Sequence, residues 1–207
     1  GSIVSASADR QLPVGAPPAP RNTILVAAGA VAVAGTMLMY GMLATWFKFR
    51  DASPLRVAKN GKMIRDWLPA DIAIPEVATN TLMITIVVSC VMAQWAVYSA
   101  KRNDASHAGL ALIVTSMLGV ALINGQAAVY MQMGIGILDG PYQTMFYAVT
   151  GTMLFLLVTG LVFSLVTMFR VYAGRVRDYQ VVSAHALYWY FLAMTFLAVW
   201  FVVYVQK

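Results

Sequence analysis

Residues 142–169 read YQTMFYAVTGTMLFLLVTGLVFSLVTMF, a stretch of 28 residues that contains no Lys, Arg, Asp, Glu or His. A helix needs ~20 predominantly apolar residues to cross the ~30 Å hydrocarbon core of a bilayer, and it satisfies its backbone hydrogen bonds internally. Four other stretches share this length and character. The five stretches are residues 23–47, 77–100, 108–138, 142–169 and 186–206. The sequence therefore predicts an all-α integral membrane bundle of five transmembrane helices.

Composition and patterning argue against the two main alternatives, a soluble domain and an outer-membrane barrel. The 207 residues are 60% hydrophobic and 11% charged, whereas soluble domains are about 25% charged. The strands of a barrel alternate apolar and polar residues over ~10-residue segments. Residues 195–203, TFLAVWFVV, show no such alternation. Helices are therefore the predicted spanning elements.

The chain divides into a tail and a membrane domain. Residues 1–22 contain four prolines and no apolar core, which is typical of a disordered Pro/Ala-rich tail and not of a signal peptide. Residues 23–207 form the predicted five-helix membrane domain, with a long loop at 48–76. Within this loop Asn60-Gly61 indicates a turn, and we expect the segments 67–69 and 72–75 to lie on the surface.

The basic residues predict how the chain is oriented. The net charge is +6, and Lys and Arg flank the apolar stretches, which indicates anionic lipid headgroups and not nucleic acid as their partners. The tail and the 101–107 and 170–184 connections hold seven basic residues, whereas the 139–143 connection holds only Asp139. We expect a multi-pass protein of the cell inner (plasma) membrane, and the positive-inside rule predicts that its N-terminus lies in the cytoplasm and its C-terminus outside. The six basic residues of the 48–76 loop argue for the opposite orientation.

The chain lacks the groups that carry chemistry inside a membrane. Ionisable side chains in a bilayer are costly and usually functional, and the five stretches contain none. No phosphate-binding loop, metalloprotease motif or paired-cysteine motif is present. His107 and His185 border predicted spans and are interpreted as interfacial polar residues. We expect no catalytic residue, no bound cofactor and no metal ligand in this chain.

Neutral polar side chains inside the spans have a structural interpretation. Asn80, Gln94, Asn124 and Gln126 are the strongest hydrogen-bonding groups there. Such groups commonly join neighbouring helices, each contact contributing less than ~2 kcal/mol. We expect them to hold helices together and not to line a transport pathway.

Short motifs spread along the chain resemble those of a known family. The motifs are Asn80-Thr81, Gln94-Trp95-Ala96, Gly119 with Gly125-Gln126 and Tyr130, Phe146-Tyr147-Ala148-Val149-Thr150-Gly151 with Gly160, and Tyr188-Trp189-Tyr190-Phe191 with Trp200. In their order and spacing they resemble subunit III of the haem–copper oxidases (cytochrome c oxidases) in its short five-helix form. The resemblance spans about residues 30–205. It implies a subunit that holds no redox centre, packs against the catalytic subunit and binds phospholipid in a cleft.

The chain departs from the family pattern wherever that pattern is ionisable. Six aligned positions usually hold Glu, His or Asp in the family and are neutral here. They are Thr36, Val129, Met153, Leu156, Tyr190 and Ala193. Any role that depends on those carboxylates, such as modulating proton uptake, is therefore in doubt, while the helical frame is retained.

We therefore expect a non-catalytic, subunit III-like component of an aerobic respiratory terminal oxidase. Its implied partners are catalytic subunit I, the other oxidase subunits and phospholipids, with haem and copper held by the partner subunits. The alternatives are an accessory subunit of another membrane complex, such as nitric oxide reductase, and a small transporter. Aromatic belts are expected at Trp46, Trp95, Tyr98, Tyr188, Trp189 and Trp200. The candidate lipid or interface residues are Thr36, Asn80, Trp95, Gln126, Tyr147, Trp189 and Tyr190.

Overall fold

The computed structural model describes residues 23–175 and 179–206, and the predicted tail 1–22 lies outside them. In the described part, five helices are long and apolar enough to cross a membrane, which confirms the predicted fold class. The helices are α2 (Thr23–Ala52), α3 (Glu76–Lys101), α4 (Ala105–Met133), α5 (Pro141–Arg170), followed by the π-turn η1 (Val171–Arg175), and α6 (Tyr179–Val199), followed by η2 (Trp200–Val205).

Several helix ends differ from the predicted ones. The first helix continues to Ala52 because Lys48, which is exposed, and Arg50, which is half-buried, do not interrupt it. The third ends at Met133, within the apolar stretch 108–138, because Gly134 adopts a left-handed conformation with φ 62°. The last begins at Tyr179, seven residues before the predicted start at 186. Hydropathy marks the apolar part of a helix, whereas backbone conformation and packing set its ends.

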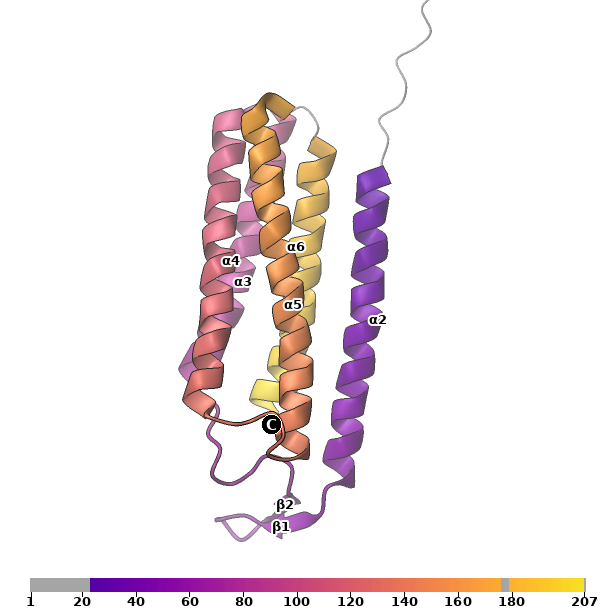
Figure 1. The fold of residues 1–207 in the computed structure, drawn as a ribbon, viewed down its shortest axis with the longest axis vertical. Coiled ribbons are helices and arrows are strands. Elements are labelled where there is room, and N and C mark those ends of the chain that lie inside the picture. The colour runs from indigo at the N-terminus through magenta and orange to yellow at the C-terminus, as the bar shows by residue number, and fades with distance from the viewer. Residues whose placement is uncertain (1–22, 176–178, 207) are drawn as a thin grey trace, which may run out of the picture.

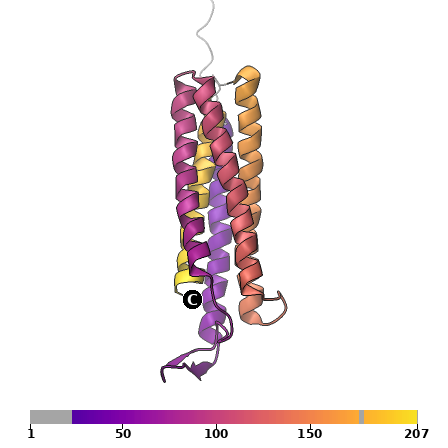
Figure 2. The ribbon, with the colours of Figure 1, turned by 90° about the vertical axis from the view of Figure 1, so that its left-hand side faces the viewer.

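The helices run up and down through one bundle (Figures 1 and 2). A tight turn joins α3 to α4, and there Asn103 takes a positive φ of 56°. Asp104 caps α4 by accepting a hydrogen bond from the His107 backbone N–H at 3.2 Å. The most internal helix is α6, which contacts α2, α3 and α5, whereas α2 lies at the edge and contacts only α6 and α5 extensively.

The long connection between α2 and α3 contains a small hairpin. Strands β1 (Leu55–Val57) and β2 (Met63–Arg65) pair antiparallel, and Gly61 in the connecting turn has a φ of 80°. The predicted turn at Asn60-Gly61 is therefore confirmed. The prediction that residues 67–69 lie on the surface is wrong for Trp67, which is only 4% exposed.

Candidate functional site

The edge helix α2 is packed along only part of its length. Three of its 30 residues are buried, and all three lie in its second half: Met39, Leu43 and Trp46. Its first half leaves a hollow of about 260 Å³ beside α5 and α6. The hollow is lined by Ile24, Ala27, Ala28, Val31, Thr159, Phe163 and Tyr188.

The two hydroxyl groups in the lining of this hollow have no free hydrogen-bond donor. The Tyr188 hydroxyl donates to the Leu156 carbonyl at 2.7 Å, and the Thr159 hydroxyl donates to the Phe155 carbonyl at 3.0 Å. The other lining side chains are aliphatic or aromatic. Such a surface suits a hydrocarbon chain and provides no ligand for an ion.

Close contacts hold the middle of α2 against its neighbours. A Cβ atom added to Gly35 would lie 2.5 Å from Phe191 Cζ, so the absence of a side chain lets α2 approach α6. The Thr152 hydroxyl donates to Met42 Sδ at 3.2 Å. Thr36 lines a smaller hollow of about 50 Å³ between α2 and α6, and its own hydroxyl is bonded to the Ala32 carbonyl at 2.7 Å.

An aromatic cluster packs the second half of α2 against the α2–α3 connection and α5. The rings of Trp46, Trp67 and Tyr142 lie edge to face, with centroids 5.1–5.5 Å apart. The ring N–H groups and the hydroxyl have no hydrogen-bond partner among the described residues. The edge-to-face packing of the rings compensates part of the free-energy cost of these missing hydrogen bonds. Trp46 is 0% exposed, so the prediction that it belongs to an interfacial belt is wrong.

Three of the predicted polar and aromatic site residues tie helices together. Gln126 Nε2 donates to the Tyr204 hydroxyl at 3.2 Å, within the core. On the bundle surface, Trp200 Nε1 donates to Asn80 Oδ1 at 3.0 Å, and Tyr190 donates to Gln94 Oε1 at 2.7 Å. The interpretation of Asn80, Gln94 and Gln126 as interhelical contacts is confirmed, while Asn124 is exposed.

The remaining predicted site residues lie elsewhere in the bundle. The Tyr147 hydroxyl donates to the Ile135 carbonyl at 2.6 Å, and its ring stacks on Tyr130 at 4.8 Å. Trp95 is half-buried, and its ring centroid lies 6.1 Å from that of His107. The seven predicted residues come from all five spans and do not converge on one site. Gln126 and Trp189 are enclosed by the chain itself, so neither can contact lipid directly.

A buried polar cluster at α5 and α6 was missed by the sequence reasoning. Ser164 Oγ lies 2.6 Å from His185 Nε2 and accepts a hydrogen bond from Trp189 Nε1 at 3.0 Å. His185 and Trp189 are both 0% exposed, so the predictions of an interfacial histidine and of a belt position at Trp189 are wrong. The reason is the early start of α6, which places His185 in its second turn.

No described part of the chain gathers metal ligands. Residues 23–175 and 179–206 hold no group of three or more His, Cys, Asp or Glu side chains that could bind a metal ion. His107 lies at the surface, and its Nδ1 is 2.5 Å from Asp104 Oδ2. The hydrogen bonds from His107 hold the pKa of the Asp104 carboxyl below its ordinary value. This pair closes the α3–α4 turn.

The positions that depart from the family pattern are mostly internal. Val129, Met153 and Leu156 are 0%, 1% and 8% exposed. Thr36 and Ala193 are half-buried, and Tyr190 is exposed. An ionised side chain at the first three positions would have to be desolvated inside the bundle. Their neutral replacements pack into the core instead.

Comparison with known families agrees with this arrangement of helices. A family model described as cytochrome c oxidase subunit III matches residues 27–207. The match includes all five membrane-spanning helices except the first four residues of α2.

Proposed function

The chain belongs to the cytochrome c oxidase subunit III family, and from this premise we propose that it is a non-catalytic subunit that stabilises the catalytic subunit of an aerobic terminal oxidase and binds phospholipid. Membership implies association with other haem–copper oxidase subunits. In this proposal the partner subunits, including the catalytic subunit I, hold haem and copper, and this chain holds neither. The alternative complexes and a transport function receive no support from a specific feature of the bundle.

The hollow beside α2 carries the lipid-binding part of the proposal. Its lining is aliphatic and aromatic, and its two hydroxyls are bonded to backbone carbonyls. The hollow opens between α2 and the α5–α6 pair, so a phospholipid acyl chain bound there would fill space that the chain's own helices leave. Burial of each CH₂ group contributes about 0.8 kcal/mol. The bound lipid would thereby hold the first half of α2 against the bundle.

The charge distribution supports a plasma-membrane orientation with the start of α2 on the cytoplasmic side. Lys101, Arg102, Arg170 and Arg175 lie at that end of the bundle, whereas the 134–140 connection at the other end contains only Asp139 as a charged residue. The hairpin connection opposes this orientation with its own basic residues. Alkaline phosphatase fused after residue 206 tests it: activity is expected, and an inactive phosphatase fusion with an active cytoplasmic reporter would reverse the orientation.

Purification through an affinity tag on this chain tests membership in an oxidase. We expect haem-containing subunits to co-purify and the preparation to show a reduced haem spectrum. A stable, haem-free homo-oligomer that moves a solute across liposomes would contradict the proposal. Haem or copper bound by the isolated chain would contradict the proposal that this subunit is non-catalytic.

A further inference from the structure

The hairpin between α2 and α3 presents apolar side chains to its surroundings. Val57 pairs with Met63, and Leu55 pairs with Arg65. Because directly paired residues and alternate residues of a strand lie on the same side, Leu55, Val57, Met63 and Arg65 share one face. The three apolar side chains on it are 56%, 66% and 58% exposed. A two-stranded hairpin is marginally stable in water on its own. An exposed apolar face on such a hairpin indicates an interaction surface.

Specific contacts fix the base of this hairpin. The Arg56 side chain donates to the Leu68 carbonyl at 2.6 Å and lies 3.3 Å from the Asp66 carboxylate. Arg65 Nη1 donates to the Ser53 carbonyl at 3.1 Å. The apolar face is therefore presented in a defined orientation, which lowers the conformational cost of binding.

The same hairpin carries a net positive charge, although Asp66 at its base pairs with Arg56. Residues 52–65 contain no acidic residue and four basic ones: Arg56, Lys59, Lys62 and Arg65. Lys59 and Lys62 are exposed on either side of the Asn60-Gly61 turn. Carboxylates at the rim of a partner that covers the apolar face would therefore attract these two lysines and strengthen binding.

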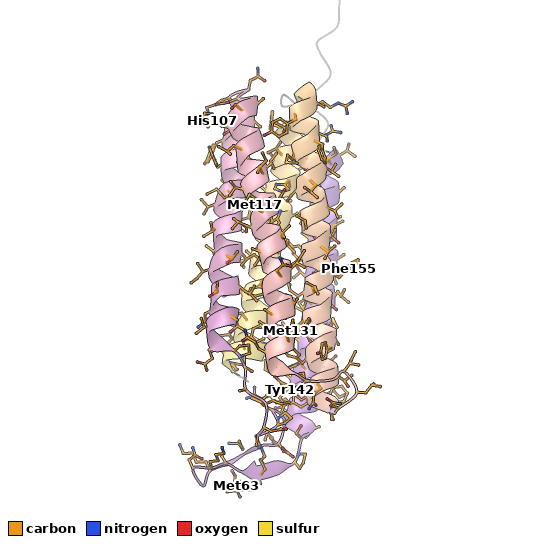
Figure 3. The ribbon with its side chains drawn as sticks, turned by 60° about the vertical axis from the view of Figure 1, so that its left-hand side comes forward. Met63, His107, Met117, Met131, Tyr142 and Phe155 are labelled. Carbon is orange, nitrogen blue, oxygen red and sulfur yellow. The ribbon has the colours of Figure 1, made fainter. Side chains whose placement is uncertain are left out.

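The position of the hairpin favours a protein partner over the membrane. The last residue of the first apolar stretch is Phe47, and α2 continues five residues beyond it to Ala52, a rise of about 7 Å. The hairpin extends further still and is the outermost described part of that end (Figure 1). Met63 lies at its outermost edge, away from the helix bundle (Figure 3). Met63, one of the three apolar residues of this face, thus lies away from the hydrocarbon core.

We propose that the face formed by Leu55, Val57 and Met63, with Lys59 and Lys62 beside it, docks an acidic protein surface of another oxidase subunit on this side of the membrane. The inference rests on the proposed function, because it takes the partner from the same complex. The basic turn orients the contact, and the three apolar side chains supply its buried centre.

Photo-crosslinking in the assembled complex tests the docking face. A benzophenone amino acid is introduced at Val57 or, as a control, at Ile64, which lies opposite Arg56 on the other face of the hairpin. We expect the Val57 probe to label an Asp/Glu-rich segment of another subunit, at least fivefold more than the Ile64 probe. The paired substitution Lys59→Glu with Lys62→Glu should reduce that yield at least fivefold. The neutral pair Lys59→Gln with Lys62→Gln should reduce it less.

The haem content of each preparation separates the two proposals. If haem co-purifies but the Val57 probe labels only phospholipid or its own chain, docking is contradicted while oxidase membership stands. Unchanged labelling after charge reversal would also contradict docking. If the wild-type chain brings down no haem-containing subunit, both proposals fail.

Discussion

Helices α2 and α6 are both apolar membrane spans, but they occupy different environments. Three of the 30 residues of α2 are buried, whereas 12 of the 21 residues of α6 are buried. Helix α6 packs against α2, α3 and α5, and α2 has a hollow beside its first half. Apolar composition therefore identifies a membrane span but does not determine its place in the bundle.

The largest difference between the two helices is expected for truncation of a large side chain. Trp189→Ala in α6 removes a fully buried ring and the hydrogen bond to Ser164. It should lower the free energy of unfolding by about 3–5 kcal/mol. Tyr40→Ala in α2 removes a ring that is 63% exposed and should have a much smaller effect. Thermal unfolding of the purified variants in one detergent measures the difference. Equal losses of stability in the two variants would contradict the difference between α6 and α2.

Close packing where the two helices meet gives the next test. Gly35→Val would place a side chain where Phe191 Cζ lies 2.5 Å from the added Cβ. Overpacking of this kind costs about 1–3 kcal/mol. Gly41→Val is the matched control on α2, because nothing lies within 4 Å of a Cβ added there. The same unfolding assay should show a loss only for Gly35→Val, and an equal loss in both variants would point to helix propensity instead.

Hydrogen bonds at buried and exposed positions sharpen the comparison further. Tyr204→Phe leaves the buried Gln126 amide without its partner hydroxyl, and the expected cost is about 1 kcal/mol. Tyr190→Phe removes a contact to Gln94 from a residue that is 42% exposed. This second change should cost less in a denaturant titration of the two variants. A larger effect at Tyr190 would show that its surface bond contributes more than the buried one.

The smallest expected effect is at the α3–α4 turn, where Asp104 and His107 lie at the surface of the bundle. Hydrogen bonds from His107 lower the pKa of Asp104 from its ordinary value of 3.8. The stabilisation is therefore present above that ordinary value and is lost as the pH falls through the lowered pKa. Asp104→Asn should remove this acid-dependent part of the unfolding curve, whereas an unchanged pH profile would exclude Asp104 as its source.

The sequence predicted the spans well because hydrocarbon length and backbone hydrogen bonding constrain each helix separately. It also predicted the turn at Asn60-Gly61, since that depends on local conformation. The buried positions of Trp46, Trp67 and His185 were not predicted. They depend on contacts between residues far apart in the chain, such as the Trp46–Trp67–Tyr142 cluster.

The candidate site was likewise predicted from the sequence only in part. Motif resemblance led to the family and to Asn80 and Gln126, which join helices. It gave no indication of the hollow beside α2, because Ala27, Ala28 and Val31 resemble every other small apolar residue in the spans. Only the lateral spacing of α2 and α5 makes these residues the lining of a cavity.

Lipid binding by a haem-containing complex is tested most directly by native mass spectrometry of the oxidase purified through a tag on this chain. We predict a mass that contains this chain, haem-bearing subunits and at least one phospholipid. That phospholipid should be lost in Ala28→Trp, which fills the hollow, and kept in Ala30→Trp, where the side chain is exposed. A haem-free homo-oligomer, or a lipid that both variants retain equally, would contradict this description of the protein.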